Sequence, residues 1–310
     1  MLRVCFIIVN YNEYQLTQKC VQSIEQLQIP LECDAPKIII IDNASPNKSG
    51  EILKKIYEFK ENICVILNKK NEGFSIANNI GFSYAKKVFL PNFIIAVNSD
   101  VIFIQKDFIV TMLKLYNEQP FWVAGPDIYV RDRYFHQNPI LNVIDYPSVE
   151  QIEIMKKQLQ NISTHVKKGD YFALKKYIKE KYRNTFMVRL YYAVKTKMQN
   201  NRPKTYNDVC LCGACIIFDQ RYIDNKDYLF RPLTFLYMEE EILCLDLFLD
   251  GIKEVFLPQL EVEHLDCGST FGNNLSFREF CDKKNQQMEQ GIESANVYIH
   301  YLKEMHLDEM

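Results

Sequence analysis

Polar residues follow several apolar segments of this chain, and their types suit a bound nucleotide and a divalent cation. Asn10–Asn12 follows the first apolar segment, Asp42 ends the second, and Asn98–Asp100 follows a later one. A carboxylate such as that of Asp42 can accept hydrogen bonds from a nucleobase or ribose, whereas Asp100 offers the oxygen ligand that a hard cation requires. Because Asp and Asn also cap helices in many proteins, each residue alone is an ambiguous signal.

The elements that must position these residues alternate regularly in the first half of the chain. Near-continuous apolar runs separated by amphipathic segments indicate a parallel sheet covered on both faces, with ligands at the carboxyl ends of its strands. The apolar runs predict strands at Val4–Val9, Lys37–Ile41, Ile63–Leu67, Phe93–Val97 and Phe121–Ala124. Helices are predicted at Gln15–Leu27, Ser49–Phe59, Ser75–Ala85 and Phe108–Tyr116. Further on, we expect strands at Val209–Phe218 and Glu254–Leu257 and helices at Glu239–Leu249 and Phe277–Tyr301.

Bulk properties narrow the class of protein. The 310 residues are 48% hydrophobic and carry a formal net charge of −2, which argues against binding nucleic acid over the whole surface. Ten cysteines are too sparse for a disulfide scaffold and favour buried, reduced thiols. The N-terminus lacks the features of a signal peptide, and no apolar run reaches the roughly 20 residues that span a bilayer. We therefore expect a cytoplasmic protein, either soluble or peripheral at the inner face of the plasma membrane.

Residues 151–205 differ in composition from the rest of the chain. Between Lys156 and Lys204 there are 14 Lys or Arg against 2 Asp or Glu. Apolar residues at four-residue spacing from Tyr182 to Met198 predict a basic amphipathic helix. It is either a solvated excursion or an interfacial helix, residues 180–203, that rests on anionic lipid near a lipid-linked acceptor.

The ordered motifs resemble glycosyltransferase family 2, in particular its rhamnosyltransferase-like members. The resemblance covers roughly residues 3–270, and its short motifs are persuasive only as an ordered set. They are Ile8-Val9-Asn10-Tyr11-Asn12, Ile40-Ile41-Asp42-Asn43-Ala44-Ser45, Asn71-Glu72-Gly73-Phe74 with Asn78-Asn79, Asn98-Ser99-Asp100, Cys212-Gly213-Ala214-Cys215, Phe235-Leu236-Tyr237-Met238-Glu239-Glu240, and Val262-Glu263-His264 followed by Ser269.

The resemblance implies a GT-A fold, which is a Rossmann-like α/β domain with a mostly parallel sheet. Residues 1–150 would form its nucleotide-sugar-binding half and 206–275 its acceptor-binding and catalytic half, with a basic helical insert at 151–205 and a helical tail at 276–310. The implied activity is inverting transfer of a hexosyl or rhamnosyl group from a UDP- or dTDP-sugar. The acceptor would be a glycan or a polyprenyl-linked saccharide in bacterial surface polysaccharide synthesis.

The resemblance also assigns roles to individual residues. Asn98–Asp100 stands where the family has its metal-binding Asp-X-Asp motif, so Asp100 and His264 are the expected ligands of Mg²⁺ or Mn²⁺. His264 also has a structural interpretation, because a lone histidine after an apolar strand is commonly just hydrogen-bonded. Binding of the nucleotide and donor is assigned to Val9, Asn10, Asn12, Asp42, Asn43, Asn71, Gly73, Asn78, Asn98 and Ser99, where Gly73 would let the backbone approach a ligand.

The catalytic base of an inverting transfer must be a carboxylate that deprotonates the acceptor hydroxyl. The resemblance assigns this role to Glu240, with Glu239 as the alternative. Glu239–Glu241 are consecutive, so mutual repulsion should raise at least one pKa, although acidic residues at a helix start also simply favour the helix dipole.

Two other residue patterns have competing interpretations. Cys210, Cys212 and Cys215 could indicate zinc, but their apolar setting and the lack of a second cysteine pair favour core packing. Two alternative functions remain open. The protein could be a sugar nucleotidyltransferase, or it could be a non-catalytic module that binds a nucleotide or a sugar. The first would show a Gly-rich basic loop after the first strand, where this chain has Asn10–Asn12, and the second would not need Glu240.

Overall fold

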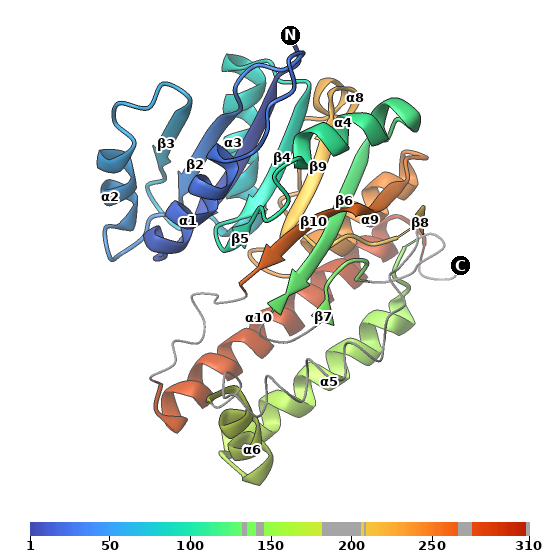
Figure 1. Cartoon of the computed structure of the whole chain (residues 1–310). Helices are drawn as coiled ribbons and strands as arrows, with labels where there is room; N and C mark the ends of the chain where they lie inside the picture. The colour runs from blue at the N-terminus through green and yellow to red at the C-terminus, as the bar shows by residue number, and fades with distance from the viewer. Residues whose placement is uncertain (132–134, 141–145, 182–205, 208, 266–274, 308–310) are drawn as a thin grey trace, which may run out of the picture.

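The strands form one mixed sheet, and its order places the carboxyl ends of the first, second and fourth strands side by side. The computed structural model describes residues 1–131, 135–140, 146–181, 206–207, 209–265 and 275–307 (Figure 1). The sheet order is β3-β2-β1-β4-β9-β6-β10-β5, with β7 paired to β6 and β8 paired to β10. The pairs within β3-β2-β1-β4 and the pair β6-β10 are parallel, and β9 runs antiparallel to both β4 and β6.

The strands have the following bounds. They are β1 Val4–Asn10, β2 Lys37–Asp42, β3 Ile63–Leu67, β4 Phe93–Asn98, β5 Val101–Ile102, β6 Val123–Val130, β7 Phe135–His136, β8 Tyr206–Asn207, β9 Cys215–Asp219 and β10 Glu254–His264. The helices are α1 Tyr14–Glu25, α2 Ser49–Ile56, α3 Gly73–Val88, α4 Phe108–Glu118, α5 Val149–Lys168, α6 Tyr171–Lys181, α8 Gln220–Asn225, α9 Glu239–Leu249 and α10 Phe277–Glu304.

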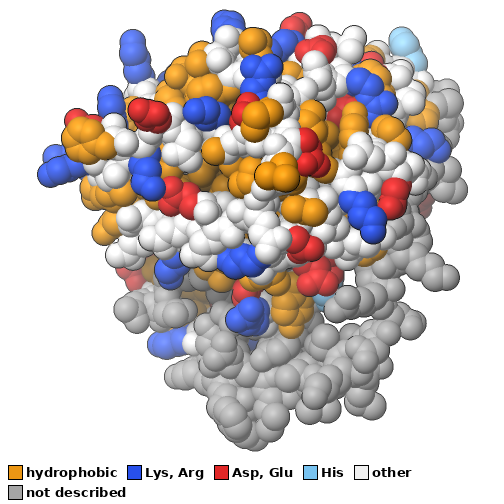
Figure 2. Space-filling model, turned by 45° about the horizontal axis from the view of Figure 1, so that its top comes forward, with side chains coloured by type: hydrophobic (Ala, Val, Ile, Leu, Met, Phe, Trp, Pro, Cys, Tyr) orange, Lys and Arg blue, Asp and Glu red, His pale blue; other side chains and the backbone are white. Residues whose placement is uncertain are grey.

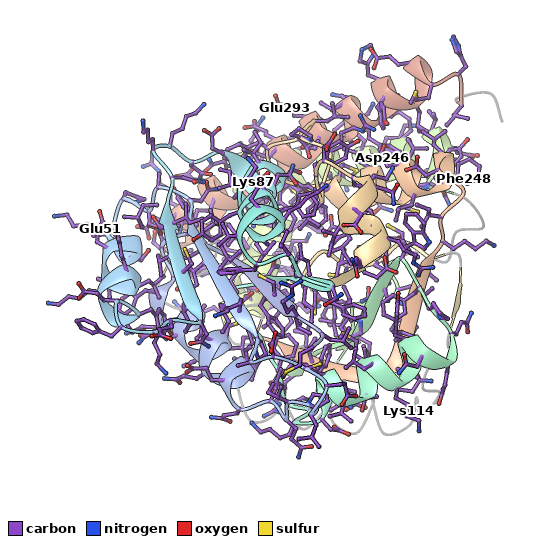
Figure 3. The ribbon with its side chains drawn as sticks, turned by 90° about the horizontal axis from the view of Figure 1, so that it is seen from above. Glu51, Lys87, Lys114, Asp246, Phe248 and Glu293 are labelled. Carbon is purple, nitrogen blue, oxygen red and sulfur yellow. The ribbon has the colours of Figure 1, made fainter. Side chains whose placement is uncertain are left out.

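Alternating side chains of the central strands fill two cores, one on each face of the sheet. In β1, Phe6 and Ile8 pack with residues of α1, α2 and α4, whereas Cys5 and Ile7 pack with α3, α8 and α9. Figure 3 shows α3, which carries Lys87, and α4, which carries Lys114, on opposite faces of the sheet. The predicted doubly wound α/β layout, with helices over both faces of a mostly parallel sheet, is therefore confirmed.

Several predicted boundaries were wrong for identifiable reasons. The strand predicted at Val209–Phe218 is limited to β9, because residues 211–214 form a loop beside the site. β10 continues past Leu257 to His264, because a shift in its register with β6 between Leu257 and Glu261 accommodates Pro258. The two-residue strand β5 was not predicted, although the apolar run Val101–Ile104 contains it.

The helices outside the sheet pack together and against α9. α5 and α10 each begin with a capping box, at Ser148 and Ser276 respectively, and they lie side by side (Figure 1). Their apolar side chains meet those of α9, as in the cluster of Ile152, Ile242 and Tyr298. The tail helix is therefore confirmed as an element, while the basic helix predicted from Tyr182 to Met198 lies outside the described residues.

The surface carries charges of both signs. Figure 2 shows lysine, arginine and acidic side chains interspersed with apolar ones over the face that it presents. Within the described part of the chain, no helix combines the length and the apolar character needed to cross a bilayer.

Candidate active site at the strand ends

Asn10 and Asp42 end neighbouring parallel strands, and their side chains bind each other. They are partners in the β1–β2 register, and the Asn10 side-chain amide donates to Asp42 Oδ1 at 2.6 Å. Asp42 Oδ1 also accepts from the Ser45 hydroxyl at 2.6 Å, and Oδ2 accepts from the Ser45 N–H at 3.1 Å. Asp42 is only 3% exposed, and these hydrogen bonds let its carboxylate hold the β2–α2 turn.

Asn43 connects the end of β2 to the loop that precedes α3. Its amide donates to Asn71 Oδ1 at 2.8 Å and to the Gly73 carbonyl at 3.1 Å. Its oxygen accepts from the Asn68 side chain at 3.1 Å and from the Glu72 N–H at 3.0 Å. Asn43 is 4% exposed and has a partner for each side-chain donor and acceptor, so it fixes this loop beside Asp42.

The backbone at Gly73 lies very close to the backbone of Phe235. Its φ is +79°, and a Cβ added there would lie 2.3 Å from the Phe235 carbonyl oxygen. The Phe74 N–H donates to that same carbonyl at 2.9 Å. Gly73 therefore lets the loop before α3 dock onto the segment that leads into α9, and its role toward a ligand stays a prediction.

Asp100 and His264 meet although 164 residues separate them in the chain. The Asp100 Oδ1 to His264 Nε2 distance is 2.9 Å, and both residues are 7% exposed. On the other side of the ring, Nδ1 lies 2.7 Å from Gln137 Oε1. Antiparallel pairing of His264 with Val101, next to Asp100, sets this geometry.

This arrangement fits a divalent cation. Because Gln137 offers an acceptor to Nδ1, a neutral imidazole points its Nε2 lone pair at the Asp100 carboxylate. Two such lone pairs at 2.9 Å repel unless a proton or a cation lies between them. Adjacent ligands of an octahedral cation with bonds of about 2.1 Å are about 3 Å apart. Gln137 supplies the outer hydrogen bond that usually orients a metal-binding histidine.

Glu240 is the partly exposed member of the three consecutive glutamates at the start of α9. Its Oε1 accepts from the Gly213 N–H at 3.0 Å, and burial raises its pKa while that hydrogen bond opposes the shift. The next residue, Ala214, accepts at 2.9 Å from the Asn98 N–H at the end of β4. One loop therefore positions Glu240 next to the Asn98–Asp100 segment.

The neighbouring glutamates are more deeply buried. Burial, and then the Glu240 charge, raises the pKa of Glu239 to about 8 and that of Glu241 to about 7. Glu239 is 3% exposed, and its Oε1 has no hydrogen-bond partner. The predicted pKa perturbation among these glutamates is thus present, and desolvation is its larger cause.

The other predicted residues divide between the site and the scaffold. Val9 pairs in register with Asn98, which aligns the ends of β1 and β4. The Asn12 N–H donates to Ser45 Oγ at 2.9 Å, beside the Asp42 network. Asn78 is buried and donates to the Phe74 carbonyl one turn earlier in α3, so its side chain is used within the helix. Ser99 lies between Asn98 and Asp100 and is partly exposed.

Two residues near the site carry little or no signal in the sequence. Gln137 follows the short strand β7 and belongs to no motif, so only the three-dimensional structure brings it to His264. Glu13 lies close enough to Asp100 that this carboxylate raises its pKa, although burial contributes more. Glu13 precedes α1 directly after Asn10–Asn12, so its place at a strand end was the one available hint.

Similarity to known proteins agrees with the fold. Residues 5–225 match the model of "Glycosyl transferase family 2", so the chain belongs to this family. The structure is also similar to two crystal structures of residues 1–349 of S. aureus TarS, at 13% identity and a TM-score of 0.50 in both cases. The match to the TarS complex with UDP covers 84% of this chain and 60% of TarS, and the second match covers 86% and 61%.

These likenesses bear on the fold, which is the GT-A fold of the family. The chain spans about 60% of the length of the TarS structures that it matches. No match was found among curated protein sequences.

Proposed function

We propose that this protein is an inverting, metal-dependent glycosyltransferase that uses a nucleoside-diphosphate sugar. The observation that carries the proposal is the partly exposed Glu240, which one loop connects to the Asn98–Asp100 segment. Membership of family 2 supports sugar transfer, and a similar TarS structure is described as a complex with UDP. We propose UDP- or dTDP-activated hexose or rhamnose as the donor, in keeping with the rhamnosyltransferase-like motifs.

In the proposed reaction, Glu240 removes the proton from an acceptor hydroxyl as its oxygen attacks the anomeric carbon. The new bond from carbon to oxygen forms as the bond from the anomeric carbon to the diphosphate breaks, with inversion. The Gly213 N–H holds the carboxylate in place and favours its ionised form. Asp42, Asn43 and their partners keep the strand ends in position beside the nucleoside.

Asp100 and His264 are the residues that would hold Mg²⁺ or Mn²⁺, with Gln137 orienting the histidine. A cation bound there supplies positive charge to the departing diphosphate. Glu13 adds a second carboxylate close to Asp100.

The acceptor that we propose is a hydroxyl of a glycan or polyprenyl-linked saccharide in bacterial surface polysaccharide synthesis. Residues 180–203 would then rest on anionic lipid. The adjoining helix α6 supports this, because it exposes Tyr171 and Ile178 among several lysines. Flotation with anionic and with neutral vesicles, with and without 180–203, tests the proposal. Equal recovery with both vesicle types would contradict it.

A panel of nucleotide sugars, including UDP- and dTDP-sugars, tests the catalytic proposal when incubated with Mg²⁺ or Mn²⁺. We expect release of nucleoside diphosphate from one donor, and a loss of about 100-fold or more in Glu240→Gln. Glu241→Gln is the matched control, since it makes the same change one residue further along α9. If Glu239→Gln abolishes release while Glu240→Gln does not, Glu239 is the base. If no donor turns over, a binding module is the better interpretation.

A further inference from the structure

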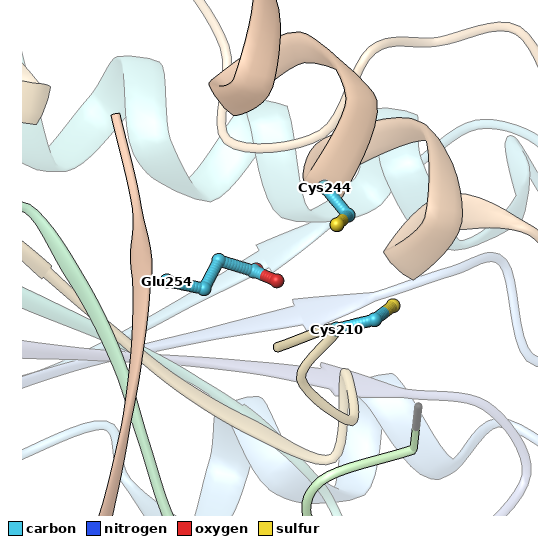
Figure 4. Close-up of side chains that lie close together, drawn as sticks. All are labelled: Cys210, Cys244 and Glu254. Atoms are coloured by element: carbon cyan, nitrogen blue, oxygen red, sulfur yellow. The ribbon is translucent and has the colours of Figure 1, made fainter. Parts of the chain in front are cut away.

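Cys210, Cys244 and Glu254 form a buried cluster away from Asp100 and His264. They come from three separate elements: the loop before β9, helix α9 and the start of β10 (Figure 4). One ligand atom from each residue, two thiol sulfurs and a carboxylate oxygen, all lie within 4.8 Å of one another. The three residues are between 0% and 5% exposed.

The Glu254 carboxylate has an oxygen without a partner. Its Oε2 accepts from the Leu211 N–H at 3.2 Å, whereas Oε1 is buried and has no hydrogen-bond partner. Leaving a buried polar atom without a hydrogen bond destabilises the fold, so such atoms are uncommon unless something binds them. Figure 4 shows this carboxylate directed between the sulfurs of Cys210 and Cys244.

We propose that Cys210, Cys244 and Glu254 bind a structural Zn²⁺ ion. Two thiolates and a carboxylate are ligands that zinc accepts in tetrahedral sites, with bonds of about 2.3 Å to sulfur and 2.0–2.2 Å to oxygen. Tetrahedral geometry at those lengths places neighbouring ligands about 3.5–3.8 Å apart. The cluster thus needs to contract by about 1.3 Å at most to match it. Among the described residues the cluster offers these three ligands, and a tetrahedral ion would take a fourth to complete its shell.

The electrostatic surroundings also suit a dication. Glu254 is 3% exposed, and α9 carries Glu240 and Glu241 as well as Cys244. A dication bound to the cluster offsets this accumulation of acidic groups and binds as the chain folds, because the site is closed in the folded protein. It would join α9, which carries Glu240, to β10 and to the loop of Gly213.

From the sequence, core packing was favoured over zinc binding for Cys210, Cys212 and Cys215. The structure separates these three residues, because Cys212 and Cys215 pack in the apolar core on one face of the sheet. Cys210 instead pairs with Cys244, 34 positions further along the chain, and no spacing motif relates the two. Cys212→Ser therefore makes a matched control for Cys210→Ser in the same loop.

The experiment measures bound metal in the full chain, purified with a phosphine reductant and without chelator. Elemental analysis should give about one zinc per chain in wild type and in Cys212→Ser. In Cys210→Ser, Cys244→Ser and the near-isosteric Glu254→Gln, zinc should fall at least fivefold. Absence of zinc from the wild type would overturn the proposal, as would full zinc in the cysteine variants.

Cobalt substitution distinguishes this site from the Asp100–His264 pair. Co²⁺ added to chelator-treated protein should produce the near-ultraviolet charge-transfer band of cobalt bound to thiolates. Cobalt bound by Asp100 and His264 alone contains no sulfur and gives no such band. The band should persist in Asp100→Asn and disappear in Cys244→Ser, whether or not sugar transfer is detected. Its absence from the wild type would refute the proposed site even if the protein is an active transferase.

Discussion

The contact between Gly213 and Glu240 allows a sharp test of how the base is held. A methyl group added in Gly213→Ala would lie 2.7 Å from Glu240 Oε1 and 3.2 Å from its Cδ. Ordinary contact begins at 3.4 Å, so the carboxylate oxygen must retreat by about 0.7 Å. The N–H to Oε1 hydrogen bond of 3.0 Å would then lengthen beyond useful range.

The expected effect follows from the energy of that hydrogen bond. A hydrogen bond to a charged group contributes about 1.5–3 kcal/mol, which corresponds to roughly a 10- to 100-fold loss of kcat at neutral pH. Because the N–H favours the ionised carboxylate, losing it raises the pKa of Glu240 further. A base must be ionised to act, so the acidic limb of the pH–rate profile should move to higher pH, and alkaline pH should restore part of the activity.

The assay is nucleoside diphosphate release from the donor that the panel identifies, measured across pH for wild type and Gly213→Ala. Gly251→Ala is the control, because its added methyl meets nothing within 4 Å. A kcat within twofold of wild type, together with an unmoved acidic limb, would refute the assignment of Gly213 as the group that positions Glu240.

Two further variants test the scaffold and the cation site. Gly73→Ala should lower the free energy of unfolding by at least about 2 kcal/mol more than Gly251→Ala does. Both glycines have a positive φ, but only at Gly73 would the added Cβ meet a carbonyl oxygen, that of Phe235, at 2.3 Å. Urea unfolding measures the difference in stability. Equal losses in the two variants would contradict the close approach. Gln137→Leu removes the acceptor that orients His264. The Mn²⁺ concentration for half-maximal activity should therefore rise about 10- to 100-fold, while kcat at saturating Mn²⁺ stays near wild type. An unchanged Mn²⁺ requirement would contradict this role of Gln137.

Most elements of the fold could be predicted from local patterns in the sequence. The apolar runs that became β1, β2 and β4 point alternate side chains into two cores, so composition and spacing sufficed to place them. β9 was harder, because nothing local indicates that a strand from the second half enters between β4 and β6 and runs antiparallel to both. That insertion depends on long-range packing, and it is what brings Gly213 and Ala214 to the end of β4.

The site was predictable only where its residues stand at strand ends. Asn10 and Asp42 meet because parallel strands in register end together. The meeting of Asp100 with His264 was reached through family motifs, since its physical cause, the pairing of β10 with β5, leaves no local trace. Gln137 and the partnership of Cys210 with Cys244 depend wholly on tertiary contacts.

The buried glutamates of α9 imply a pH dependence of stability that runs opposite to that of ordinary salt-bridged carboxylates. Burial raises the pKa of Glu239 to about 8 from the usual 4.5, so the folded chain binds this proton more tightly than the unfolded chain. The associated stability is fully present below about pH 4.5 and decreases as pH rises toward 8.

Replacing Glu239 with Gln removes this titration. The stability of Glu239→Gln relative to wild type should therefore increase between pH 5 and pH 8, by an amount on the order of a few kcal/mol, since each tenfold change in proton affinity is worth about 1.4 kcal/mol. Urea unfolding at several pH values measures the difference, with the exposed Glu118→Gln expected to run parallel to wild type. If Glu239→Gln also runs parallel to wild type, then Glu239 is ionised at neutral pH, and a cation or a donor group outside the described contacts must be compensating its charge.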